Sequence, residues 1–209
     1  MDDTFFSIRS ATTAQIKVEG SRFIADSIPV TNENEAKEHL ERIKKKYFDA
    51  THHCFAYVIG AGRAIARYYD DGEPSGTAGI KILSAIQSKK LSDILIVVTR
   101  YFGGTKLGVG GLGRAYFDSA LHGIASAEII SKGTMLVVEI VFSFNETNPV
   151  MNAVHANKLK IVETSYVDTH STLRVLVPPS QFNIFKSTLT DATRARAEIS
   201  TVGEKTIIL

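Results

Sequence analysis

Apolar residues recur with two different periods along the chain, and each period predicts one type of element. Residues 14–30, AQIKVEGSRFIADSIPV, hold two apolar, β-branched runs on either side of an EGS turn signal, which predicts a β-hairpin. In the following TNENEAKEHLERIKKKYF, apolar residues recur every three to four positions, as on one face of a helix. Asn32 with Glu35 three residues later resembles a capping box, which places the start of this helix.

Shorter runs predict the next elements. Residues 52–60 and 63–69 have the composition of two strands around a GAGR turn, and TAGIKILSAIQ has the pattern of a helix. The continuous apolar run in DILIVVTRYF is typical of a strand buried on both faces. A further helix is predicted from about Gly111 to Ile130. The first 130 residues therefore resemble one α/β unit.

The rest of the chain alternates more regularly. TMLVVEIVF predicts a strand, and NPVMNAVHAN predicts a helix with Asn148 as its cap and Pro149 at its first position. IVETSYVDT and TLRVLV predict two strands, followed by a helix capped by Ser180, and RARAEIST with KTIIL predicts a terminal strand pair or one bent strand. This β-α-β-β-α-β order is ferredoxin-like. We expect an α/β (α+β) protein with two domains, residues 1–132 and 133–209.

Composition narrows the class of protein only slightly. Hydrophobic residues make up 44% and charged residues 22%, as in ordinary globular proteins, and a net charge of +2 neither favours nor opposes a nucleic-acid partner. The single cysteine, Cys54, cannot form an internal disulfide. Neither a secretory signal nor a membrane-spanning run is recognisable. These features predict a cytoplasmic protein with no membrane partner.

The glycine-rich segment RYFGGTKLGVGGLGRAY fits neither common nucleotide motif well. Gly108-x-Gly110-x-x-Gly113 formally matches the dinucleotide fingerprint, but GGTKL separates it from the preceding strand. Lys106 is followed by leucine rather than serine or threonine, so the segment is not a P-loop. We therefore predict no cofactor here.

The same segment has the features of an anion site. Glycines before a helix expose backbone N–H groups, and the positive end of the helix dipole attracts phosphate. Cations surround the segment with no acid between them, and aromatic residues beside it are suited to stacking on bases. Equally, the glycines could serve only to pack the helix closely against the strand. The candidate nucleic-acid or phosphate-binding residues are Arg100, Tyr101, Gly103, Gly104, Lys106, Gly110, Gly111 and Arg114.

Two polar clusters raise the question of metal binding. Asp70, Asp71 and Glu73 in DDGEPSGTAG could hold a hard cation or act as acid and base. Alternatively, Asp-Gly forms a turn, and the acids complement the dipole of the helix that follows. His52 and Cys54 are expected on one face of a strand with His53 on the other, which is not a tetrahedral zinc set. No metal site is predicted.

In their order, these motifs resemble a known family. DDGEPSGTAG, VVTRYFGGTKLGVGGLGRAY, HHCFAYVIG and GSRFIADSIPV are similar to the bacterial, YigZ/YvyE-type branch of the IMPACT family. The chain departs from the usual family pattern at His53, Lys81 and Gly113. The resemblance implies an N-terminal domain like domain 2 of a small-subunit ribosomal protein and domain IV of elongation factor G. It also implies a C-terminal domain like domains III and V of that factor.

The resemblance and the residues together give one leading hypothesis and two alternatives. The leading one is a non-enzymatic, translation-associated regulator that binds RNA or a ribosomal surface through the Arg100–Arg114 cleft, with the acidic turn at its rim. The first alternative is a metal-dependent enzyme acting on a nucleotide or phosphoester through Asp70, Asp71 and Glu73. The second is a protein-interaction module, with a partner in the translation apparatus docking on the C-terminal domain.

Overall fold

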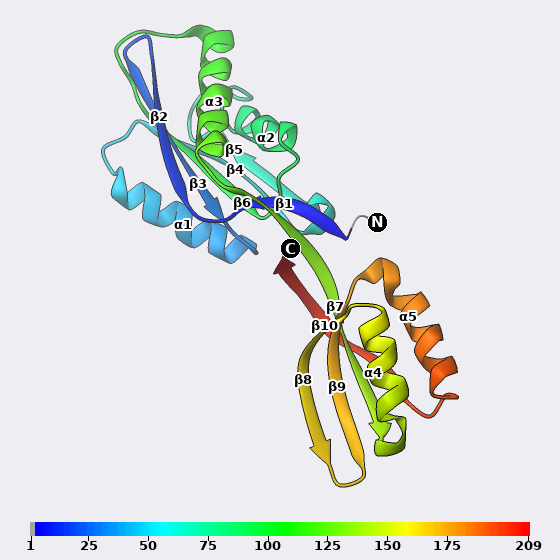
Figure 1. Cartoon of the computed structure of the whole chain (residues 1–209). Helices are drawn as coiled ribbons and strands as arrows, with labels where there is room; N and C mark the ends of the chain where they lie inside the picture. Colours follow the sequence, from blue (N-terminus) through cyan, green and yellow to red (C-terminus); the bar gives the residue numbers. More distant parts are fainter. Residues whose placement is uncertain (1–2) are drawn as a thin grey trace. The chain divides into compact units, whose positions relative to one another are not determined.

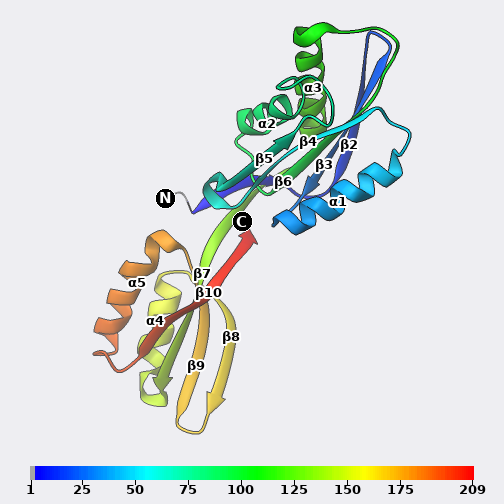
Figure 2. The ribbon, with the colours of Figure 1, turned by 180° about the vertical axis from the view of Figure 1, so that it is seen from behind.

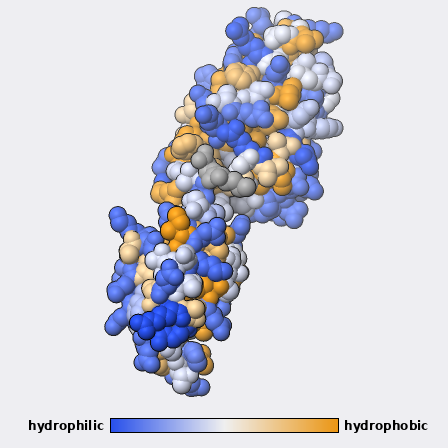
Figure 3. Space-filling model, turned by 90° about the vertical axis from the view of Figure 1, so that its right-hand side faces the viewer, coloured by the Kyte–Doolittle hydropathy of each residue, from blue (hydrophilic) through white to orange (hydrophobic). Residues whose placement is uncertain are grey.

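The computed structural model describes residues 3–209, which form two compact units (Figure 1). One unit comprises Phe5–Ser131, and the other comprises Lys132–Leu209 with Asp3 and Thr4. Each has an antiparallel sheet packed against helices, so the α+β class predicted from the sequence is confirmed. Hydrophilic and hydrophobic residues are mixed over the surface of both units on the face shown in Figure 3. Among residues 3–209, no helix is long and apolar enough to cross a membrane.

The N-terminal unit is a sheet with helices on both faces. The strand order is β2-β3-β6-β4-β5. Helix α1 covers one face, and helices α2 and α3 cover the other (Figures 1 and 2). The bounds are β2 Thr12–Val18, β3 Ser21–Pro29, α1 Glu33–Lys46, β4 His52–Ile59, β5 Ile65–Tyr69, α2 Gly79–Ser88, β6 Ile94–Tyr101 and α3 Gly108–Ala125, with a 3-10 turn at Ala61–Arg63.

Strand β6 lies at the centre of this sheet, paired with β3 and β4. Its side chains alternate between two cores, because successive residues of a strand point to opposite faces. Ile96 and Val98 pack with α2 and α3, whereas Leu95 and Val97 pack with α1. The apolar run is therefore continuous because both faces are covered, as the sequence predicted.

Two local signals in this unit are also confirmed. The β2–β3 hairpin closes at Val18 and Ser21, and its two turn residues, Glu19 and Gly20, have φ of +44° and +80°, as a type I′ turn requires. At the start of α1, Asn32 Oδ1 accepts a hydrogen bond from the Glu35 backbone N–H at 3.0 Å. The Glu35 carboxylate reaches back to the backbone N–H of Thr31, and this bond lowers the pKa of Glu35.

The C-terminal unit has the ferredoxin-like strand order. Strand β10 pairs with β7, followed by β9 and β8, which is order 4-1-3-2 counted from β7, and β1 also pairs with β7. Helices α4 and α5 supply Val150, Val154, Phe185 and Leu189 to the core with the sheet. The bounds are β7 Ile129–Ser143, α4 Thr147–Ala156, β8 Lys160–Val167, β9 His170–Val177, α5 Pro179–Ala192 and β10 Glu198–Ile208, with a 3-10 turn at Phe144–Glu146. Strand β1, Thr4–Ile8, belongs to the N-terminal unit from Phe5 onward, and the first residues of β7 belong to that unit as well.

Three predicted boundaries in the second half were wrong. Helix α3 ends at Ala125, and the β-branched pair after Glu128 starts β7, because Arg9 binds Glu128 through its backbone N–H and its side chain. Helix α4 starts at Thr147, whose hydroxyl donates to the Phe144 carbonyl, so Asn148 is not the cap.

Helix α5 starts at Pro179, after Pro178, so Ser180 lies inside the helix and is not its cap. The Ser180 backbone N–H and hydroxyl instead donate to the Asp3 carboxylate. The last segment is one bent strand, because β10 pairs with β7 throughout, with a bulge between Thr201 and Gly203.

Candidate functional site

The glycine-rich segment forms the loop after β6 and the first turns of α3. Figures 1 and 2 show this loop beside the tip of the β2–β3 hairpin. Gly103 N–H donates to Ser21 Oγ at 3.1 Å, and a Cβ on Gly103 would lie 2.0 Å from the Gly20 carbonyl carbon. No real Cβ fits at that distance. Gly103 is therefore required by the close approach of two backbones.

The other glycines of the segment fall into two groups. Gly104 and Gly108 have φ of +87° and +70°, a backbone conformation that favours glycine. Gly110 and Gly111 are exposed and have no such φ. A Cβ on Gly110 would meet nothing within 4 Å, and one on Gly111 would only contact Leu107 at 3.5 Å. Neither packing nor backbone geometry therefore requires glycine at these two positions.

Gly111, the second of these glycines, lines a hollow of about 470 Å³, which we call the Lys106 hollow. The residue before α3, Leu107, makes no capping hydrogen bond with its side chain, and the first turn of the helix has no acid. Lys106 and Arg114 are exposed, and their side chains make no hydrogen bond or salt bridge within residues 3–209. The hollow is lined by Val18, Glu19, Thr105, Lys106, Leu107, Gly111, Arg114, Ala115 and Asp118.

Two acids in this lining were missed in the sequence. Asp118 lies four residues after Arg114, so helical periodicity could have placed both on one face of α3. Glu19 comes from the hairpin turn, and no local signal links it to a segment so far along the chain. The cations are therefore not the only charges at the hollow. A ligand must match two acids as well as Lys106 and Arg114.

Arg100 is placed differently from Lys106 and Arg114. Its Nη1 lies 2.7 Å from Glu73 Oε1, and the two side chains are only 7% and 4% exposed. The guanidinium also lies 5.4 Å from the ring centroids of Phe23 and Phe102. Arg100 thus joins the acidic turn to the strand that precedes the glycine-rich loop. It does not line the Lys106 hollow.

Tyr101 is likewise held by neighbouring side chains. Its hydroxyl donates to Asp49 Oδ1 at 2.8 Å, and the Arg22 guanidinium lies 4.2 Å from its ring centroid. Partial burial and the nearby Asp49 raise the pKa of Tyr101 above its ordinary value. One face of the ring is therefore already covered by a cation. The residues gathered at the Lys106 hollow are Lys106, Gly111 and Arg114, with Gly110 adjacent in the first turns of α3.

Each carboxylate of the acidic turn has its own partners in the protein. Asp70 caps α2, because its Oδ1 accepts from the backbone N–H groups of Ala78 and Gly79 at 3.0 and 2.8 Å. Asp71 Oδ2 accepts from the His53 N–H at 2.6 Å, and Glu73 pairs with Arg100. The described residues contain no group of three His, Cys, Asp or Glu side chains that could hold a metal. The geometry therefore favours the turn-and-cap interpretation.

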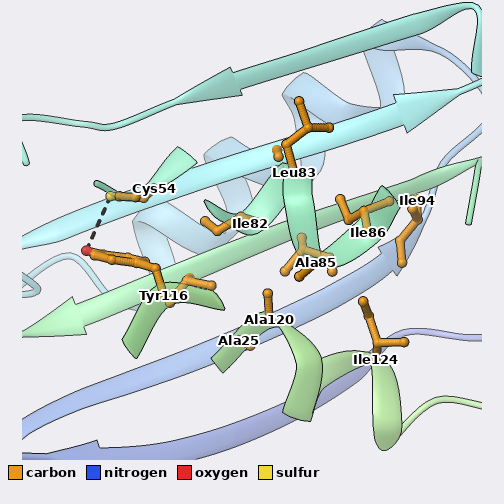
Figure 4. Packing of buried hydrophobic residues seen from close by; sticks show 14 of the residues in the cluster. Ala25, Cys54, Ile82, Leu83, Ala85, Ile86, Ile94, Tyr116, Ala120 and Ile124 are labelled. Carbon is orange, nitrogen blue, oxygen red and sulfur yellow. Dashed lines mark hydrogen bonds between the residues drawn. The ribbon is translucent and has the colours of Figure 1, made fainter. Parts of the chain in front are cut away.

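A buried polar network extends from Glu73 to Cys54. The Tyr116 hydroxyl donates to Glu73 Oε1 at 2.8 Å, and Cys54 Sγ lies 3.3 Å from Tyr116 Oη. Figure 4 shows these last two side chains pointing toward each other, from β4 and α3. Burial raises the pKa of the Cys54 thiol well above its ordinary value, so the thiol stays neutral and unreactive. His52 and His53 lie on opposite faces of β4, as predicted, at the carbonyls of Asp71 and Tyr47.

Comparison with known proteins identifies the family. A sequence model described as the Impact N-terminal domain matches residues 19–124, which include the glycine-rich segment and the acidic turn. The chain belongs to the IMPACT family. It is 35% identical over 205 residues to the IMPACT family member YvyE of Bacillus subtilis, covering 98% of this chain and 94% of that protein.

Two further matches extend over most of the chain. The IMPACT family member YigZ of Escherichia coli is 28% identical over 190 residues, covering 90% of this chain and 93% of that protein. The crystal structure of a hypothetical protein superposes with a TM-score of 0.69 at 26% identity, covering 97% of this chain and 98% of the other. The similarity to IMPACT family members thus includes both units.

Proposed function

We propose that this IMPACT family protein is a non-enzymatic, translation-associated regulator that binds RNA, free or in the ribosome, at the Lys106 hollow. The observation that carries the proposal is the pair Gly110 and Gly111. Glycine inside a helix costs roughly 0.5–1 kcal/mol relative to alanine, and nothing in the fold requires glycine at either position. A ligand that approaches the helix backbone closely would explain why these two positions hold glycine, because any side chain there would block its approach.

The two cations at the hollow support a phosphate-bearing ligand. Lys106 and Arg114 have no partner in the described chain, whereas Arg100 and Arg22 are engaged with neighbouring side chains. The first N–H groups of α3 lack a side-chain cap, and helix dipoles favour anions at this end. Unpaired cations beside free backbone amides bind phosphate oxygens without regard to sequence. Membership in a family linked to translation regulation supports RNA as the source of that phosphate.

The C-terminal unit is less suited to RNA. On the sheet face away from α4 and α5, Arg174 binds Glu139 and Glu163 at 2.8 and 2.7 Å, and these pairs raise the pKa of Arg174. Ferredoxin-like domains that bind RNA on the sheet use aromatic residues for stacking, and this position holds an ion-pair network instead. We therefore assign RNA binding to the N-terminal unit. Docking of a protein partner on the C-terminal unit remains an alternative outcome.

The test is the double variant Lys106→Ala/Arg114→Ala. Its affinity for single-stranded RNA and for ribosomes should fall by about tenfold, and each lost phosphate contact should flatten the salt dependence by about 0.7 in log–log slope. Fluorescence anisotropy and co-sedimentation over a salt series measure both quantities. The matched control is Lys186→Ala/Lys205→Ala, which removes two exposed cations of the C-terminal unit. Equal loss in both variants would contradict the site, and unchanged binding in both would contradict the proposal.

Gly110→Ala should move stability and binding in opposite directions. Alanine is the better helix former, so the free energy of unfolding should rise by about 0.5–1 kcal/mol. The added methyl group faces open space, where the ligand backbone is expected, so RNA affinity should fall severalfold. Urea unfolding and anisotropy provide the two readouts. Gly203→Ala adds a methyl group to equally open space in the C-terminal unit and should leave RNA affinity unchanged.

A further inference from the structure

A second hollow continues from the first along α3. It has a volume of about 410 Å³, and its lining includes Lys17, Lys89 and His122. Val18 and Asp118 line both hollows, so the two are neighbours, and we call them together the α3 groove. Arg114, Asp118 and His122 follow at intervals of four residues along one side of the helix, and β2 forms the opposite wall.

The groove is longer than one phosphate site. Arg114 and His122 are eight residues apart, which is roughly 12 Å along a helix axis at 1.5 Å per residue. Lys106 and Arg114 stand at one end, and Lys17 and Lys89 stand at the other. Between them, Val18 and Leu121 provide apolar surface. Cations at both ends with apolar surface between them match a chain in which phosphates alternate with sugars and bases.

Two acids, Glu19 and Asp118, depart from this charge pattern, and of the two only Asp118 lines both hollows. Asp118 lines both hollows, and its carboxylate makes no hydrogen bond or salt bridge within residues 3–209. A carboxylate is an acceptor only, so it opposes a phosphate chain unless the ligand brings a donor to it. In RNA the ribose 2′-hydroxyl lies beside each phosphate and can donate a hydrogen bond. DNA has no such group.

We propose that Asp118 selects RNA over DNA by accepting a hydrogen bond from a ribose 2′-hydroxyl in the α3 groove. This inference rests on the proposed function, because the phosphates on either side are held by Lys106 and Arg114 at one end and by Lys17 and Lys89 at the other. The carboxylate acts in two ways. It accepts a hydrogen bond from a ligand that carries the hydroxyl, and it repels the phosphates of a ligand that lacks it.

Three oligoadenylates of about twelve nucleotides, a length within the range of single-strand binding sites, test the inference in the full-length protein. They are RNA, DNA of the same sequence, and 2′-O-methyl RNA, which keeps the ribose oxygen but cannot donate from it. The wild-type protein should bind RNA about tenfold more tightly than either of the others, since a hydrogen bond to a charged group accounts for at least that factor. Fluorescence anisotropy measures the three affinities.

Asp118→Ala should remove this preference. Its affinity for RNA should fall to the level of DNA, while its affinity for DNA should stay the same or rise because the repulsion is gone. Asp118→Asn, which retains an accepting oxygen, should keep part of the preference. Asp191→Ala removes an exposed acid of the C-terminal unit and should change nothing. Retention of affinity for DNA also shows that Asp118→Ala is folded.

The outcomes separate this inference from the proposed function. If wild-type protein binds RNA and DNA equally, or if Asp118→Ala keeps the preference, Asp118 does not read the ribose, although RNA binding at the Lys106 hollow stands. An equal loss of affinity for RNA and DNA in Asp118→Ala would overturn the ribose contact in favour of a group that both oligoadenylates carry, such as the adenine amino group. If no oligonucleotide binds in a Lys106- and Arg114-dependent manner, both proposals fall.

Discussion

Glu73→Ala is expected to lower the free energy of unfolding by about 3–5 kcal/mol, because breaking a buried ion pair leaves the other charge uncompensated. Arg100 would lose the carboxylate 2.7 Å from its Nη1 and could not reach bulk water. The Tyr116 hydroxyl would lose its acceptor at the same time. Urea unfolding, followed by circular dichroism, measures the change from the transition midpoint and slope.

Double substitution distinguishes lost charge pairing from lost packing. Glu73→Leu/Arg100→Met replaces both charges with apolar groups of similar length, so it should be more stable than Glu73→Ala despite carrying two changes. Glu73→Gln keeps an acceptor for Tyr116 and should show an intermediate loss. A loss below about 1 kcal/mol in Glu73→Ala, the size typical of an exposed pair, would contradict the buried pairing.

Gly103→Ala is the second large effect that we expect. The new Cβ would lie 2.0 Å from the carbonyl carbon of Gly20 and 2.2 Å from the backbone nitrogen of Ser21. Loop and hairpin must separate, so stability should fall by about 1–3 kcal/mol or more, as in overpacked sites. RNA affinity should fall with it, because Lys106 is carried by the displaced loop. Urea unfolding and anisotropy give the two values.

Substitutions at neighbouring glycines are controls that separate steric overlap from backbone strain. Gly104→Ala has open space but a φ of +87°, so it should lose only the backbone-strain contribution, which is of order 1 kcal/mol. Gly110→Ala has neither clash nor strain and should gain stability. Were Gly103→Ala no worse than Gly104→Ala, the close contact between loop and hairpin would not exist in solution.

The elements that the sequence predicted correctly are those with strong local signals. The buried strand β6 was recognisable because an unbroken apolar run needs cover on both faces, and α1 because Asn32 caps it locally. Two of the three boundary errors came from distant partners. Glu128 is bound by Arg9, and Ser180 by Asp3, so neither boundary could be deduced from its own neighbourhood.

The candidate site likewise contains residues that local sequence signals place and residues that only distant contacts place. Lys106 and Arg114 both line the hollow because Lys106 precedes α3 and Arg114 lies in its second turn, a closeness that the sequence already implies. Arg100 and Glu73 are 27 residues apart, and only the fold shows that each neutralises the other. A cation in a sequence therefore predicts an anion site only when the fold shows that no acid of the same protein already pairs with it.

The glycine-rich loop is fixed at both of its ends. Gly103 is bonded to the hairpin at Ser21, and Tyr116 of the helix that follows is bonded to Glu73 inside the core. These two contacts restrict the segment in the folded protein, so part of its conformational entropy is given up when the protein folds. We therefore expect the Lys106 hollow to be preorganised, so that contacts with the proposed RNA ligand would contribute to affinity without a large cost for ordering the loop.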